Sequence, residues 1–215
     1  MKKLNVILLL AVFGVVNSCY HEPELSSDIP LVCFKTEVLP VIQSSCVMSG
    51  CHDGGEEFFL GNYDAIVSKV TAGKPMASEL HKAIAADHNS LQIMPPKPNE
   101  PLSRKQLDKI SLWILQGAQN TSCDEVCDSV NVTFTADVLP IMETYCKGCH
   151  SGSQPRGKFL LTDYPTVKAA VEGGRMMGAV RWQNGYLKMP ENGDQLSACN
   201  IAILQKWINL GMLDN

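Results

Sequence analysis

The sequence predicts an all-α fold made of two similar helical units in tandem, and two observations carry this prediction. The first is an internal repeat: segment 32–42 returns as 132–142, with valine, phenylalanine, valine, leucine and proline at an offset of one hundred. The second is the spacing of apolar residues. In several segments they recur at the spacing of one helix face, and in no segment do they alternate with polar residues as in a strand. Because the period is too long for a solenoid repeat, each copy is expected to be a domain.

The two copies share further landmarks in the same order. A tyrosine-led apolar segment comes first, then a Met-Pro pair, a Leu-Ser pair, and a Trp-Ile pair with glycine four residues after the tryptophan. This order indicates a duplicated unit. The pairs of landmarks are Tyr63 and Tyr164, Met94-Pro95 and Met189-Pro190, Leu102-Ser103 and Leu196-Ser197, Trp113-Ile114 and Trp207-Ile208, and Gly117 and Gly211.

The first helix of each unit is predicted from a proline. Pro40 and Pro140 fit only the first turn of a helix, where the missing amide hydrogen has no partner to lose. A helix is therefore expected to begin near Glu37 and Asp137 and to run into the cysteine motif that follows.

The later helices are predicted from capping signals. Ser103 with Gln106 forms a capping-box pattern, and the helix that it opens has glycine as its stop. The matching helix spans 197–211. Shorter helices are expected from Tyr63 to Gly73, and from Pro165 to Gly173.

The N-terminus resembles an export signal. Two lysines precede the apolar run 4–16, which is shorter than the roughly 20 residues that a membrane span needs. Residues 1–18 are interpreted as a signal peptide, and Cys19 as the lipid-modified first residue of a bacterial lipoprotein, because the preceding residues resemble a lipobox. The alternative is a signal peptide with a cysteine nearby by chance. Residues 19–30 are expected to be a tether.

The composition limits the class of protein. Nine cysteines in 215 residues point to an exported protein, located in the periplasm or on the cell surface. The formal charge of −4 argues against a nucleic-acid partner, which would require a basic surface. Residues 121–130 contain several acids and are interpreted as a solvated linker.

The strongest motif is Cys146-Lys147-Gly148-Cys149-His150, the attachment pattern of a c-type haem. Two thiols on one turn can bond the two vinyl groups of a porphyrin, and the adjacent histidine can then bind the iron. A zinc half-site, a redox dithiol and a disulfide are the alternatives. Zinc would need further ligands that do not stand out, and a thioredoxin-type dithiol is found at a helix start rather than a helix end.

A weaker copy of the motif occupies the same place in the first unit. Cys46 and Cys51 are separated by four residues, and His52 follows. The segment must bulge to bring both thiols to one porphyrin, which Gly50 allows. Its position in the repeat favours a second haem, and the alternative is a degenerate copy that holds a disulfide.

Two methionines are candidates for the sixth iron ligand. Met94 and Met189 each precede a proline, which keeps the methionine in an extended conformation. His/Met ligation raises the reduction potential, as electron carriers require. His81 or His88 could replace Met94, although both are interpreted as exposed helix residues. The other methionines are interpreted as packing residues.

Four cysteines remain outside these motifs, and the sequence allows three pairings among them. Cys33 and Cys123 bracket the first unit, whereas Cys127 and Cys199 belong to the second. We adopt the pairs Cys33–Cys123 and Cys127–Cys199 as the hypothesis.

Together these motifs resemble the class I cytochrome c superfamily, especially the planctomycete-type cytochrome c domains of exported bacterial proteins. The resemblance covers residues 31–120 and 131–215 and implies two tandem cytochrome c-like domains. It implies that Cys46, Cys51, His52 and Met94 hold one covalent haem c, and that Cys146, Cys149, His150 and Met189 hold the other. The widened first motif departs from the family pattern and leaves open whether that haem has one thioether or two.

The expected function is that of a membrane-anchored dihaem electron carrier whose redox protein partners are unknown. It is not expected to be an enzyme. A dihaem peroxidase is one alternative and would need an iron with an open position. The other alternative is a binding module with structural or absent haem.

Overall fold

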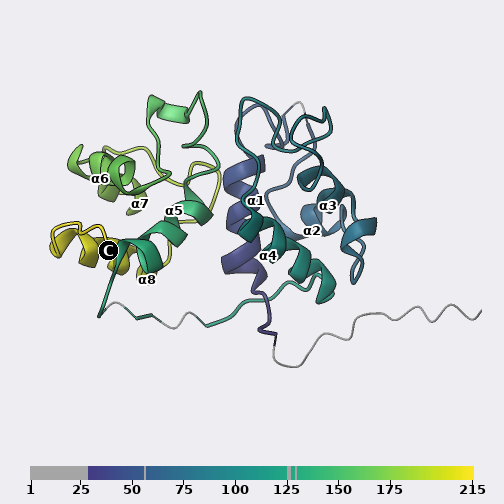
Figure 1. The fold of residues 1–215 in the computed structure, drawn as a ribbon, viewed down its shortest axis with the longest axis horizontal. Helices are drawn as coiled ribbons and strands as arrows, with labels where there is room; N and C mark the ends of the chain where they lie inside the picture. The colour runs from purple at the N-terminus through teal and green to yellow at the C-terminus, as the bar shows by residue number, and fades with distance from the viewer. Residues whose placement is uncertain (1–28, 56, 125–126, 129) are drawn as a thin grey trace, which may run out of the picture. The chain divides into compact units, whose positions relative to one another are not determined.

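The structure, a computed structural model, describes residues 29–55, 57–124, 127–128 and 130–215. The chain divides into two units, 1–30 and 31–215, and the described helices all lie in the second unit. The interpreted signal peptide, Cys19 and the tether up to residue 28 fall outside the described residues. Within the described ranges every regular element is helical, which confirms the all-α prediction (Figure 1).

The first half of the unit contains four α-helices. A wide π-helical turn (Phe34–Val38) leads directly into the first of them, and a 3₁₀ turn (Pro75–Ala77) precedes the third. The helices are α1 (Leu39–Cys46), α2 (Tyr63–Val67), α3 (Glu79–Ile84) and α4 (Arg104–Leu115).

The second half also has a π-helical turn followed by four α-helices, but its 3₁₀ turn lies in a different place. This half begins with a π-helical turn (Phe134–Val138), and a 3₁₀ turn (Arg156–Lys158) follows its first helix. The helices are α5 (Leu139–Tyr145), α6 (Tyr164–Glu172), α7 (Met176–Val180) and α8 (Ala198–Asn209). Among the residues that are described, none of these helices or those of the first half has the length and apolar character to cross a membrane.

Both first helices begin as the prolines predict, with Pro40 and Pro140 in the first turn. The preceding π-helical turns are held by an acidic side chain. Glu37 accepts the backbone N–H of Cys33 at 2.7 Å, and Asp137 accepts that of Thr133 at the same distance. The carboxylates satisfy amides that have no partner inside the helix.

The last helices are capped and stopped in the same way in both halves. Ser103 forms the predicted capping box with Gln106 at the start of α4, and Ser197 accepts the N–H of Asn200 at the start of α8. Each helix is followed by a glycine at positive φ, +97° at Gly117 and +88° at Gly211. These angles suit glycine, which has no Cβ to clash with the backbone.

Each half encloses its own hydrophobic core, drawn only from its own residues. The last helix of each half contacts the π-helical turn at the start of that half, so the two ends of the repeat meet (Figure 1). At both meeting points a phenylalanine packs between a tyrosine and a tryptophan. These aromatic triads are Phe34, Tyr63 and Trp113 in the first half and Phe134, Tyr164 and Trp207 in the second.

Hydrogen bonds from side chains to backbone carbonyls also occur at equivalent positions in the two halves. The indole N–H of Trp113 donates to the carbonyl of Gln119, and that of Trp207 donates to the carbonyl of Leu213, both at 2.9 Å. The hydroxyls of Tyr63 and Tyr164 donate to backbone carbonyls beyond the last helix, also at 2.9 Å. The duplication read from the sequence therefore extends to individual bonds.

The structure corrects three details of the sequence reading. The helix that begins at Tyr63 ends at Val67 and not at Gly73, because the chain turns after it and the Gly73 N–H donates to Ile114 on α4. The sequence reading placed His81 on a helix but gave no bounds for α3, and it missed α7; both helices are only one or two turns long. His81, interpreted as exposed, lies on α3 and is 8% exposed.

Both disulfide pairs adopted from the sequence are present among the described residues. Cys33 is bonded to Cys123, with their Cα atoms 5.8 Å apart, and Cys127 is bonded to Cys199, with a Cα separation of 5.5 Å. The second bridge ties the start of α8 to the segment before the second half. The four motif cysteines are all free.

Candidate functional site

The first cysteine of each motif lies at the end of the first helix of its half. Cys46 is the last residue of α1, and Cys146 directly follows α5, with its N–H donating to Met142 at 3.0 Å. The motifs therefore come at a helix end, as expected from the sequence. A thioredoxin-type dithiol uses a helix start, where the helix dipole favours the thiolate.

Both motifs close with the same hydrogen bond despite their different lengths. The N–H of His52 donates to the carbonyl of Cys46, and the N–H of His150 donates to that of Cys146, each at 3.0 Å. The two additional residues of the first motif form a bulge that contains Gly50 at a φ of +79°. The widened motif consequently returns its histidine to the same backbone position as the standard one.

The His150 side chain is held in one tautomer. Its Nδ1 lies 2.9 Å from the carbonyl oxygen of Arg156, and because a carbonyl can only accept, Nδ1 carries the proton. Nε2 then has the lone pair that a metal requires. The ring of Phe159 stacks on the imidazole with centroids 4.3 Å apart and planes at 21°.

Burial lowers the pKa of His150, and the carbonyls of Arg156 and Phe159 oppose this effect without cancelling it. A lowered pKa keeps the imidazole neutral near pH 7. Metal ligation needs that neutral form.

His52 has a similar neighbour but lacks the equivalent bond. Phe58 lies against its ring, with centroids 4.4 Å apart. Its Nδ1 is buried and has no hydrogen-bond partner among the described residues. The loop that follows is shorter in this half: Leu60 N–H closes it on the His52 carbonyl, whereas Leu161 closes the longer loop on His150.

The first thiol of each motif is not activated. Burial, with a smaller effect from the neighbouring Cys51, raises the pKa of Cys46 to about 12. Burial and the neighbouring Cys149 raise the pKa of Cys146 to about 12. Redox dithiols depend on a lowered thiol pKa, so these environments argue against that alternative.

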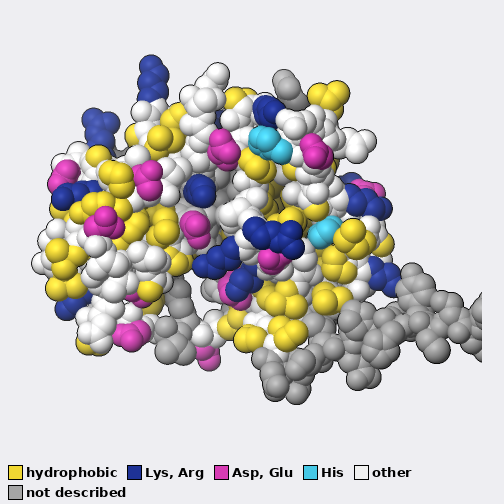
Figure 2. Space-filling model, in the orientation of Figure 1, with side chains coloured by type: hydrophobic (Ala, Val, Ile, Leu, Met, Phe, Trp, Pro, Cys, Tyr) yellow, Lys and Arg dark blue, Asp and Glu magenta, His cyan; other side chains and the backbone are white. Residues whose placement is uncertain are grey.

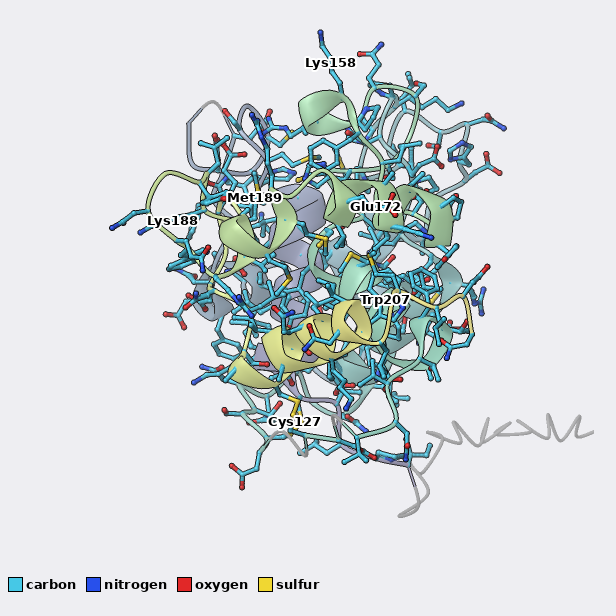
Figure 3. The ribbon with its side chains drawn as sticks, turned by 90° about the vertical axis from the view of Figure 1, so that its left-hand side faces the viewer. Cys127, Lys158, Glu172, Lys188, Met189 and Trp207 are labelled. Atoms are coloured by element: carbon cyan, nitrogen blue, oxygen red, sulfur yellow. A yellow bond between two sulfur atoms is a disulfide. The ribbon has the colours of Figure 1, made fainter. Side chains whose placement is uncertain are left out.

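The two candidate methionines occupy equivalent backbone positions. The N–H of Met94 donates to Ala83 at 3.0 Å, and that of Met189 donates to Ala179 at 3.2 Å. Met189 is fixed further by the indole N–H of Trp182, which donates to its carbonyl at 2.9 Å. In Figure 3, Met189 lies beside α7 in the body of the second half. The contacts described for both methionines involve their backbones, and none of them joins a methionine to the histidine of its half.

The donor groups fit a haem better than a zinc ion. In the described part of the chain no three histidine, cysteine or acidic side chains are grouped as a metal site would require. A haem c needs only the two thiols and one neutral imidazole on this side, and the oriented His150 provides the imidazole. An open cavity of about 410 Å³ is lined by Phe159, Leu160, Ala169 and four other residues of this half.

Two contributors to the site were missed in the sequence. Phe58 and Phe159 lie at equivalent places in the repeat, two residues before Leu60 and Leu161. Aligning the copies through these leucines would have found both phenylalanines. The Arg156 carbonyl had no such signal, because every residue has a backbone carbonyl.

The fold and the site define this chain as an all-α protein with a duplicated cysteine–histidine site. Comparison with protein-family models, with curated proteins and with solved structures finds no match for it.

Proposed function

We propose that the chain is a dihaem c-type cytochrome that carries electrons. Its two cytochrome c-like domains would span 31–120 and 131–215, joined by the linker 121–130. The observation that carries the proposal is the shared closure of the two cysteine–histidine motifs, His N–H to the carbonyl of the first cysteine, at the end of equivalent helices. A degenerate motif without function would have no reason to preserve this closure.

Each motif residue has a defined task in this proposal. The four thiols, Cys46 with Cys51 and Cys146 with Cys149, attach the porphyrins. His52 and His150 bind the iron from one side, and Met94 and Met189 are the proposed ligands on the other. When bound, haem supplies an iron that gains and loses one electron between its ferrous and ferric forms.

The rest of each half excludes water and fixes the ligands. In each aromatic triad the phenylalanine and the tryptophan are nearly fully buried and the tyrosine is partly buried, so the triad holds the start of its half against the last helix. The Arg156 carbonyl orients the second histidine. The protein contributes position and electrostatics while the cofactor supplies the redox chemistry.

The proposed location is outside the cytoplasm, on a membrane, through a lipid on Cys19. Two disulfides in the described structure support an oxidising compartment. On the face in Figure 2, acidic and basic side chains are interspersed among apolar ones.

The test is a pyridine haemochrome assay combined with intact mass, on protein exported from cells that attach haem c. We expect two haems per chain. A double variant, Cys146→Ser with Cys149→Ser, is expected to retain one haem, on the first motif. Replacing Cys33 and Cys123 in the same way is the control and is expected to retain two. A wild-type chain without added porphyrin mass would refute the proposal.

A further inference from the structure

The second cysteine–histidine motif contacts α1, the helix that leads into the first motif, across the boundary between the halves. Helices α1 and α5, which lead into the two motifs, pack together. The hydroxyl of Ser44 donates to the carbonyl of Thr144 at 3.0 Å, and these two residues are equivalent in the repeat. The thiol of Cys149 donates to the carbonyl of Ser44 at 3.2 Å.

Gly148 makes the closest approach. A Cβ built on Gly148 would overlap the backbone carbonyl of Ser44 and the amide nitrogen of Ser45. Backbone atoms cannot move aside as the end of a flexible side chain can. The glycine between the two cysteines of the second motif therefore packs directly on the helix that leads into the first motif.

Two polar side chains of the second half close the same contact. Asn192 donates to the carbonyl of Val47 at 2.7 Å, and Arg156 donates to the carbonyl of Ser49 at 3.1 Å. Val47 is the C-cap of α1 and Ser49 follows two residues later, so both carbonyls belong to the segment that leads out of this helix. Ser44 and Ser45 are each about 5% exposed or less, so the contact is dry on the α1 side.

These contacts concentrate on the segments that would attach the cofactors. A linker alone would let the halves take many relative positions. Backbone packing at Gly148, together with hydrogen bonds to the Ser44, Val47 and Ser49 carbonyls, selects one position. With haem bound, the Cys149 sulfur would be a thioether and would no longer donate, so Gly148, Asn192 and Arg156 would maintain the contact.

We propose that this contact is a fixed junction that holds the two haem-attachment segments at one separation, so that electrons pass directly between the two sites. The inference rests on the proposed dihaem function. The exchange moves one electron from the ferrous to the ferric site, and no other reactant takes part. Gly148, Asn192 and Arg156 act as positioning residues in the junction and do not bind the iron.

The test compares two ways of opening the junction. Gly148→Leu adds a side chain that the Ser44 backbone cannot accommodate, and its control is Lys147→Leu, at the neighbouring position between the same cysteines. The double variant Arg156→Ala with Asn192→Ala lies outside the motif, so it remains informative if Gly148→Leu fails to mature. Its control is Arg181→Ala, which removes a hydrogen bond to Gln205 inside the second half.

The readouts are the magnetic coupling between the two ferric sites, measured by electron paramagnetic resonance, and the radius of gyration from small-angle scattering. Gly148→Leu and Arg156→Ala/Asn192→Ala are expected to lose the coupling and to increase the radius, with two haems still attached. The wild type and both controls are expected to retain the coupling and the smaller radius. Unchanged coupling and radius in both test variants would overturn the junction, as would equal losses in the controls.

The haem count separates this inference from the function on which it rests. If the wild-type chain carries no haem, the proposed function fails, and the scattering comparison still shows whether Gly148 holds the halves together. If two haems are present and the scattering does not change in either test variant, only the junction fails.

Discussion

At the scale of single residues, the two halves differ in how the histidine proposed to bind iron is supported. The Nδ1 of His150 donates to the Arg156 carbonyl, whereas the Nδ1 of His52 is buried without a partner among the described residues. A hydrogen bond at Nδ1 makes the imidazole a stronger electron donor and favours ferric iron. The two sites should therefore have different potentials.

We expect the site at His150 to have the lower reduction potential. A potentiometric titration of the wild type should resolve two waves. Met94→His and Met189→His assign them, because replacing a thioether ligand with a nitrogen lowers the potential of the affected site. The wave that moves in Met189→His is expected to be the lower wave of the wild type.

The opposite assignment, or a single two-electron wave, would contradict the link between the Nδ1 bond and the potential. An independent readout is the Nδ1–H resonance in the diamagnetic ferrous protein. It should exchange slowly with solvent at His150, where the Arg156 carbonyl holds the proton.

At the scale of helices, the sequence predicted helix starts correctly where the signal lies within the helix's own first turn. The capping box at Ser103 and the prolines of α1 and α5 act within one turn and need no information from the rest of the fold. The short helices α2, α3 and α7 were mispredicted or left without bounds because elements of one or two turns depend on tertiary contacts. The end of α2 is set by the bond from Gly73 to Ile114 on α4.

Ser103→Ala is expected to lower the free energy of unfolding by about 1 kcal/mol, the usual value of an N-cap side chain. Urea unfolding of the mature protein measures it. Ser111→Ala in the same helix is the control: its hydroxyl only bonds back to the Leu107 carbonyl, so the change should be close to neutral. Equal losses in the two variants would show that the cap is not the cause.

At the scale of the whole molecule, the chain forms two small hydrophobic cores and is crosslinked by two disulfides between residues distant in the sequence. Cores of fewer than a hundred residues bury little apolar surface, so crosslinks add substantially to their stability. The bridge between Cys33 and Cys123 spans 90 residues, and the bridge between Cys127 and Cys199 spans 72.

Replacing Cys33 and Cys123 together by serine is expected to cost about 4 kcal/mol, because loops of this length lose much entropy on closure in the unfolded chain. Replacing Cys127 and Cys199 should cost a similar amount. The measurement is urea unfolding without reductant, with the haem count checked in each variant. A loss below about 1 kcal/mol with two haems retained would show that the bridge does not constrain the unfolded chain.

The sequence alone was enough to predict the helical class, the duplication, and the cysteines, histidines and methionines that are the candidate ligands. These follow from residue type and spacing, which are visible along the chain. It could not determine the Arg156 carbonyl at His150, the buried position of His81 or the approach of Gly148 to Ser44. Those depend on backbone atoms and burial, which acquire partners only when segments distant in the sequence pack together.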